Sequence, residues 1–132
     1  MSEAAKPVKI PGPDHPIIVT RNANHVVVRF AGHVVADTRA ALTLKEASYP
    51  AVLYIPRKDA DMALLRRTEH ASYCPYKGDA SYFTLAADGR EAANAVWTYE
   101  HPHPAMAAIK DYLAFYPDRV DAIEERSAAE AR

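Results

Sequence analysis

Short runs of alternating apolar and polar residues, separated by turn-forming residues, occupy most of the sequence. In residues 25–30 (HVVVRF) the valines and the phenylalanine at every second position share one face, and Arg29 lies on the other. A period of two residues is typical of a half-buried β-strand. Ala-Gly at residues 31–32 and Asp-Gly at residues 88–89 separate such runs, which predicts β-hairpins. The sequence therefore favours a sheet-based fold.

The same reasoning extends to the rest of the chain. The predicted strands are residues 16–20, 25–30, 33–38, 41–46, 51–55, 81–86 and 93–99. The predicted helices are residues 59–68, a segment from Pro104 that Pro117 ends, and residues 118–125. We therefore expect a mainly β protein, a compact antiparallel barrel-like or two-layer fold of about seven to eight short strands, with about two or three short helices.

The length of the chain favours one domain. At 132 residues a single hydrophobic core can form without disulfides. Residues 1–16 contain four prolines and few large apolar side chains, which predicts an extended arm. Residues 17–125 then form the β-rich domain, and residues 126–132 form a frayed C-terminus.

Charge and composition exclude several classes of partner. The formal net charge is −1 and the isoelectric point is near 6.6. The chain therefore lacks the excess of positive charge that is typical of proteins that bind nucleic acid or an anionic membrane. No apolar run reaches the roughly 18 residues of a membrane-spanning helix, and the start of the chain lacks a signal sequence. A single cysteine cannot form an internal disulfide, so we expect a cytoplasmic protein.

Residues 68–82 (TEHASYCPYKGDASY) concentrate the most reactive side chains of the chain. Pro75 and Gly78 exclude a regular helix or a central strand, so we expect a shaped loop that holds Cys74 and Lys77 near its bend. Lys77 can hold a carboxylate or phosphate together with the free N–H groups of the loop. The alternative is a solvated surface lysine.

Two further residues near this loop are candidates for catalysis. Cys74 is a nucleophile if Lys77 lowers its pKa, but no base is evident, and a small buried side chain that anchors the loop is favoured. Glu46 follows two inward-facing leucines, so its carboxylate needs a partner, which Arg29 or Lys77 can provide. If Glu46 is functional, it acts as a general base or contacts a ligand. A structural ion pair is the favoured alternative for this residue.

Aromatic residues on the predicted strands form a further group. Tyr54, Tyr82, Trp97 and Tyr99 can line a pocket that stacks a planar or sugar ligand. Core packing is the alternative, and it is favoured for Trp97 and Tyr82.

Histidines and phosphate-binding motifs give no cofactor prediction. His101 and His103 are two residues apart, and His70 and Cys74 can complete a metal set. No C-x-x-C accompanies them and prolines flank both histidines of the pair, so an exposed turn is favoured and we expect no metal or cofactor. Arg66 and Arg67 fit one face of a short helix and not a nucleic-acid patch.

Several segments resemble one family of small bacterial proteins, the domain-of-unknown-function 427 family. They are GHVVADT with LTLKE, YPAVLYIP, CPYKGDASYF and AVWTYEHP, and they span roughly residues 17–116. The resemblance implies a compact, mainly β fold with no established activity. The family is sometimes labelled nucleotidyltransferase-like, but this chain has no G-x-x-x-x-G-K-[ST] phosphate loop.

The leading hypothesis is a soluble protein that binds a small polar or anionic molecule, with or without catalysis, in a pocket beside the CPYKG segment. The predicted ligand-binding residues are Arg29, Glu46, Tyr54, Lys77, Tyr82 and Trp97, and Glu46, Cys74 and Lys77 are the catalytic candidates. The alternative is a protein-interaction or homo-oligomerisation module, in which the aromatic strands bury a partner.

Overall fold

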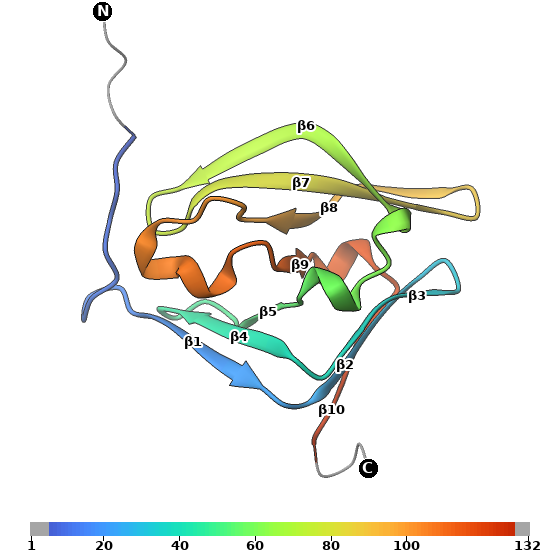
Figure 1. The fold of residues 1–132 in the computed structure, drawn as a ribbon, viewed down its shortest axis with the longest axis horizontal. Coiled ribbons are helices and arrows are strands. Elements are labelled where there is room, and N and C mark those ends of the chain that lie inside the picture. Colours follow the sequence, from blue (N-terminus) through green and yellow to red (C-terminus); the bar gives the residue numbers. More distant parts are fainter. Residues whose placement is uncertain (1–5, 129–132) are drawn as a thin grey trace, which may run out of the picture.

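Antiparallel strands in three sheets make up the protein in this computed structural model, which describes residues 6–128 (Figure 1). The first sheet has the order β1–β4–β5, with β1 at Ile17–Asn22, β4 at Ala41–Glu46 and β5 at Val52–Tyr54. The second has the order β10–β2–β3, with β10 at Ala122–Arg126, β2 at His25–Phe30 and β3 at His33–Thr38. The third has the order β6–β7–β8–β9, with β6 at Leu65–Cys74, β7 at Gly78–Ala87, β8 at Arg90–Thr98 and β9 at Leu113–Phe115.

Helical structure within residues 6–128 is limited to short 3-10 turns. They are η1 (Arg57–Asp59), η2 (Met62–Leu64), η3 (Pro104–Ile109) and η4 (Pro117–Arg119). The prediction of a mainly β, antiparallel domain is confirmed. The described strands number ten rather than seven or eight, and their three sheets do not close into a barrel. No helix in this part of the chain has the length and apolar character needed to cross a membrane.

The predicted helix at residues 59–68 and the predicted loop at residues 68–82 are both wrong. Within residues 59–68 only Asp59, the last residue of η1, and η2 are helical, and residues 65–74 form the long strand β6, which carries Arg66 and Arg67. Strand β6 turns at residues 75–77 into β7, so the CPYKG segment is the tip of a hairpin. The apolar spacing of Met62 and Leu65, three residues apart, belongs to a single 3-10 turn.

Each of the two predicted C-terminal helices is a short 3-10 turn followed by a strand. Met106 and Ile109 are buried on η3, but Leu113 begins strand β9. Residues 122–126 form β10, which pairs with β2 instead of continuing a helix from η4. Strand β9 has only three residues, all of them buried, so it has no alternation that a sequence pattern can detect.

Both predicted two-residue hairpin turns are present. Ala31 and Gly32 have φ angles of 52° and 80°, and Asp88 and Gly89 have 50° and 78°. Positive φ at both central residues matches the right-handed twist of the flanking strands. These turns fix the pairing of β2 with β3 and of β7 with β8.

Two hydrophobic clusters lie on opposite faces of the strands that they share. On β7, Phe83 and Leu85 belong to the first cluster, whereas Ala80 and Tyr82 belong to the second. Successive strand residues point to opposite faces of a sheet, which explains this division. The first cluster also contains Val26, Val28 and Phe30 of β2 with Val35 and Ala36 of β3, and the second contains Leu44 of β4.

The N-terminal segment of the described chain crosses the tip of the β6–β7 hairpin. The Lys9 amide donates to the Pro75 carbonyl at 2.9 Å, and Lys6 Nζ bonds Asp79 at 2.7 Å. Residues 1–5 and 129–132, the outer parts of the predicted arm and of the predicted frayed end, lie outside the described residues.

Candidate functional site

A largely buried ion pair links the end of a strand in the first sheet to a hairpin turn of the third sheet. Glu46 is the last residue of β4, and Lys77 lies in the turn between β6 and β7. Lys77 Nζ donates to Glu46 Oε1, and Lys77 is only 7% exposed. The structure therefore pairs Glu46 with Lys77 and not with Arg29.

The second oxygen of Glu46 binds the N-terminal arm. His15 Nε2 lies 2.7 Å from Glu46 Oε2, and the His15 ring stacks on Tyr76 with centroids 4.2 Å apart. Burial alone would raise the pKa of the Glu46 carboxyl, but the hydrogen bonds from Lys77 and His15 outweigh burial and hold this pKa below its usual value. Glu46 is thus an ionised carboxylate with both oxygens engaged.

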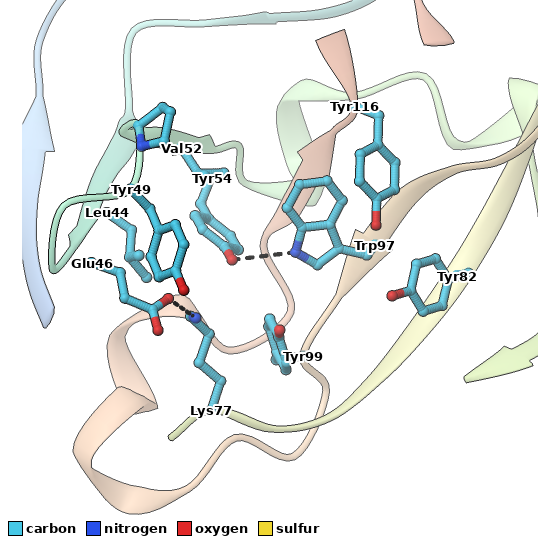
Figure 2. A pocket seen from close by; sticks show the side chains of 11 residues that line it. Leu44, Glu46, Tyr49, Val52, Tyr54, Lys77, Tyr82, Trp97, Tyr99 and Tyr116 are labelled. Carbon is cyan, nitrogen blue, oxygen red and sulfur yellow. Dashed lines mark hydrogen bonds and ion pairs between the residues drawn. The ribbon is translucent and has the colours of Figure 1, made fainter. Parts of the chain in front are cut away.

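A cavity of about 230 Å³ lies beside this ion pair. We call it the tyrosine cavity, because its polar lining consists of Glu46, Lys77 and Trp97 together with the tyrosines at positions 49, 54, 82, 99 and 116. Figure 2 shows the hydroxyl end of Tyr49 next to the Lys77–Glu46 pair, with Trp97 between Tyr54 and Tyr116. The cavity therefore combines one cation, one anion and several hydroxyl groups around apolar rings.

Trp97 lines the tyrosine cavity and contacts two of its tyrosines. Its indole Nε1 donates to Tyr54 Oη at 3.3 Å, and its ring lies 4.4 Å from that of Tyr116 between centroids. Trp97 is half-buried and packs against the second hydrophobic cluster, so it belongs to the edge of the core and lines the cavity as well. Tyr82 is buried, and its hydroxyl bonds that of Ser72 at 2.8 Å.

Burial keeps the inner tyrosines protonated. It raises the pKa of Tyr54 and of Tyr99 well above the ordinary value for a phenol, and for Tyr99 the neighbouring Tyr54 adds to this effect. Burial also raises the pKa of Tyr116, with a contribution from its hydrogen bond to Tyr82. At neutral pH these hydroxyls are neutral donors and acceptors of hydrogen bonds.

Cys74 does not line the tyrosine cavity. It is half-buried against the second hydrophobic cluster, and its Sγ lies 3.8 Å from Lys77 Nζ. No histidine contacts the thiol among the contacts of the described residues. This position matches the anchoring role that the sequence favours.

Arg29 lies away from the cavity. It is on β2, and its Nε donates to Glu124 Oε2 on β10 at 3.1 Å. Of the predicted ligand-binding residues, the structure brings Glu46, Tyr54, Lys77, Tyr82 and Trp97 together around the tyrosine cavity and leaves Arg29 outside it.

The hairpin tip is packed against the HPHP segment at residues 101–104. The His103 amide donates to the Lys77 carbonyl at 2.9 Å, and a Cβ on Gly78 would lie 3.2 Å from the His101 carbonyl oxygen. His103 also bonds the Tyr73 hydroxyl at 3.1 Å, whereas the His70 ring contacts Tyr82. Within residues 6–128 no three His, Cys, Asp or Glu side chains converge as metal ligands would.

Sequence reasoning missed several residues of this site. His15 lies in an irregular segment, where no periodicity marks a buried contact. Tyr116 was expected in a helix, and Tyr49 precedes a proline in the turn after β4. Tyr99 is not among the missed residues. It is two positions after Trp97, so a strand places both side chains on the same face, and the sequence predicts that they line one pocket.

Comparison with known families identifies a match over most of the chain. The family model described as a domain of unknown function (DUF427) matches residues 18–126, which include all the strands except the first residue of β1. No match is found among curated proteins.

Proposed function

The chain belongs to the domain of unknown function (DUF427) family, and from the tyrosine cavity we propose that it binds a small polar molecule. The observation that carries this proposal is the meeting of Lys77 and Glu46 at a cavity whose other polar groups are tyrosine hydroxyls. Ligand sites are concave and mostly apolar, with a few convergent polar groups that fix the orientation of the ligand.

The charge balance of the cavity favours an uncharged ligand over a bare anion. Glu46 neutralises Lys77, so an incoming carboxylate or phosphate meets a carboxylate next to the ammonium group. A sugar, an amide or a heterocycle offers both donors and acceptors to this pair and to the tyrosine hydroxyls. Anionic ligands remain the second class to test.

Each part of the lining has a distinct role in this proposal. Tyr54 and Tyr99 present buried, neutral phenols, and the more exposed rings of Trp97 and Tyr116 provide an aromatic surface for stacking. The engaged oxygens of Glu46 make it a poor general base, so the proposal is one of binding and assigns no catalytic residue.

No observation favours the interaction module in the same way. The large exposed apolar side chains of the described chain are spread over different segments, with Ile18 on β1, Val34 on β3 and Tyr116 next to η4. Two of the exposed apolar side chains, Tyr49 and Tyr116, line the tyrosine cavity itself.

The test is a ligand screen with two lysine variants. Hexoses, nucleosides, small amides, sugar phosphates and small carboxylates are added to the parent, and binding is followed by the fluorescence of Trp97, the single tryptophan of the chain. Lys77→Met keeps most of the apolar stem and removes the charge. A ligand of the tyrosine cavity is expected to bind this variant at least about tenfold more weakly, the loss expected for a hydrogen bond to a charged group.

Lys58→Met is the matched control, because the Lys58 side chain is 73% exposed and does not line the cavity. It is expected to bind as the parent does. Melting temperatures of both variants without ligand separate a loss of folding from a loss of binding. A ligand that binds the parent and the Lys77 variant equally well would contradict the proposal, and so would a panel that leaves the parent fluorescence unchanged at millimolar concentration.

A further inference from the structure

A second cavity, of about 470 Å³, opens from the first hydrophobic cluster. We call it the apolar cavity. Leu53 of β5 and the following Ile55 line it, whereas Tyr54 lines the tyrosine cavity. Val52 and Trp97 line both, so the two cavities adjoin each other. The volume falls within the range of roughly 300–1,000 Å³ that is typical of ligand pockets.

The lining of this cavity is almost entirely apolar. Its innermost residues are Val28, Ile55 and Phe115, which are 0%, 1% and 4% exposed, and Leu53 and Ile123 lie beside them. Each group of a ligand that these residues cover leaves water, which supplies roughly 25 cal/mol per Å² of apolar surface. The interior therefore selects the apolar body of a molecule.

The carboxylate of Glu125 lies at the rim of the apolar cavity. Glu125 of β10 lines the cavity, and its Oε2 accepts hydrogen bonds from Asn22 Nδ2 at 2.9 Å and from Asn24 Nδ2 at 2.7 Å. Asn22 Nδ2 also donates to Thr43 Oγ1 at 3.0 Å, which ties this rim to β4. The asparagines therefore hold the side chain of Glu125 in place through one oxygen.

The other oxygen of Glu125 faces no cation. Among the interactions of residues 6–128, Glu125 has no Lys, Arg or His partner, whereas the preceding Glu124 pairs with Arg29. The hydrogen bonds from Asn22 and Asn24 hold the pKa of Glu125 below its usual value, so the carboxylate is charged at neutral pH. An anchored, unpaired negative charge beside an apolar cavity is complementary to a cationic group attached to an apolar body.

We propose that the apolar cavity binds a small amphiphilic amine, with its apolar body against Val28, Ile55 and Phe115 and its ammonium group on Glu125. Burial of the apolar body supplies most of the affinity. The exposed carboxylate discriminates between head groups, since an exposed ion pair adds little energy of its own. The two cavities share Val52 and Trp97 in their linings. The residues that carry this proposal do not line the tyrosine cavity, and the proposal does not depend on the function proposed there.

The test compares three probes that share one apolar body: n-hexylamine, n-hexanol and n-hexanoate. Each is titrated into the full chain, and binding is located by the NMR shifts of the methyl groups of Val28, Leu53, Ile55 and Ile123. The amine is expected to bind about two- to fivefold more tightly than the alcohol, the gain that an exposed ion pair gives, and the carboxylate more weakly than either. All three are expected to shift the same methyl groups.

Glu125→Gln and Glu124→Gln are the paired variants. Glu125→Gln is expected to bring the amine down to the affinity of the alcohol and to leave the alcohol unchanged, whereas Glu124→Gln is expected to change neither, because Glu124 does not line the cavity. Equal binding of amine and carboxylate by the parent would overturn the proposal, as would methyl shifts outside the cavity. Shifts of these methyl groups that follow protein concentration instead of probe would identify a second copy of the chain as the occupant, and would also overturn it.

Discussion

The two hairpin turns of the third sheet are held in different ways. The turn at Asp88 and Gly89 is exposed, and a Cβ added to Gly89 meets no atom within 4 Å. The turn at residues 75–77 is covered by the N-terminal arm and the HPHP segment, and it carries the buried Lys77. The turn at Asp88 and Gly89 is shaped mainly by its own two residues. The turn at residues 75–77 instead contacts three distant parts of the chain, namely the N-terminal arm, the HPHP segment and Glu46 at the end of β4.

This difference explains where a site can form. A turn that is held only by local geometry leaves its side chains in water, where an ion pair contributes little. A turn that is packed from outside can hold a charged group out of water against a fixed partner, and Glu46 is 31 residues from Lys77 in the sequence. The candidate site therefore lies at the covered turn.

The largest difference in stability is expected between alanine substitutions of two glycines: Gly78, which follows the covered turn, and Gly89, which is the second residue of the exposed turn. Gly78→Ala places a side chain at a φ of 110° and 3.2 Å from the His101 carbonyl oxygen, and we expect a loss of about 3 kcal/mol in the free energy of unfolding. Gly89→Ala, at a φ of 78° in open space, should lose only about 1 kcal/mol. Urea denaturation of both variants measures the two losses, and equal losses would show that the covered turn gains nothing from its packing.

The next test removes the carboxylate of one ion pair at each turn. These carboxylates are Glu46, which pairs with Lys77 of the covered turn, and Asp88, which lies in the exposed turn. Glu46→Gln leaves the ammonium group of Lys77 without its charged partner, so the free energy of unfolding should fall by about 2 kcal/mol. Asp88→Asn removes an exposed pair with His33 and should cost less than about 0.5 kcal/mol. If Glu46→Gln/Lys77→Met is no more stable than Glu46→Gln, the loss does not come from the unpaired lysine.

The strands flanking the two turns differ in how well the sequence predicts them. Strands β7 and β8 alternate around Asp-Gly, and the sequence predicts both of them. Strand β6 has the sequence LRRTEHASYC, with few apolar residues, because it lies at the edge of its sheet and is largely exposed. An edge strand with a bulge and polar side chains resembles a loop in sequence, which is why β6 was missed.

The contribution of the covered turn should also depend on pH. The pKa of Glu46 is lower in the folded chain than its ordinary value of 4.5, so its ionised form stabilises the fold above pH 4.5. This contribution is lost as the pH falls below 4.5 and through the folded pKa. The difference in unfolding free energy between the parent and Glu46→Gln should shrink over that range, and a difference that stays constant down to about pH 3 would contradict the assignment.

The smallest effect is expected at the cysteine before the covered turn. Cys74→Ser loses part of the apolar contact of a half-buried side chain, and we expect a cost of about 1 kcal/mol or less. Binding in the tyrosine cavity should not change, because Cys74 does not line it. Loss of ligand binding in this variant at unchanged stability would assign Cys74 to the site.

The site itself was predictable only in part. The approach of Lys77 to Glu46 follows from two signals, a lysine at a turn and a carboxylate after inward leucines. The stack of His15 on Tyr76 joins residues 61 positions apart without any periodic pattern (15 to 76). Such contacts arise from packing between segments, and local propensity contains no information about them.

The pairing of β10 with β2 sets the order in which the fold can be completed. Residues 122–126 form a ladder with residues 25–29, so one edge of β2 stays unpaired until nearly the whole described chain has been synthesised (Figure 1). An unpaired edge strand is a template for pairing with another chain. Contacts between such distant segments also slow folding, because the loop must close before they form. Strand β2 therefore depends on the later strand β10 for protection of this edge against aggregation.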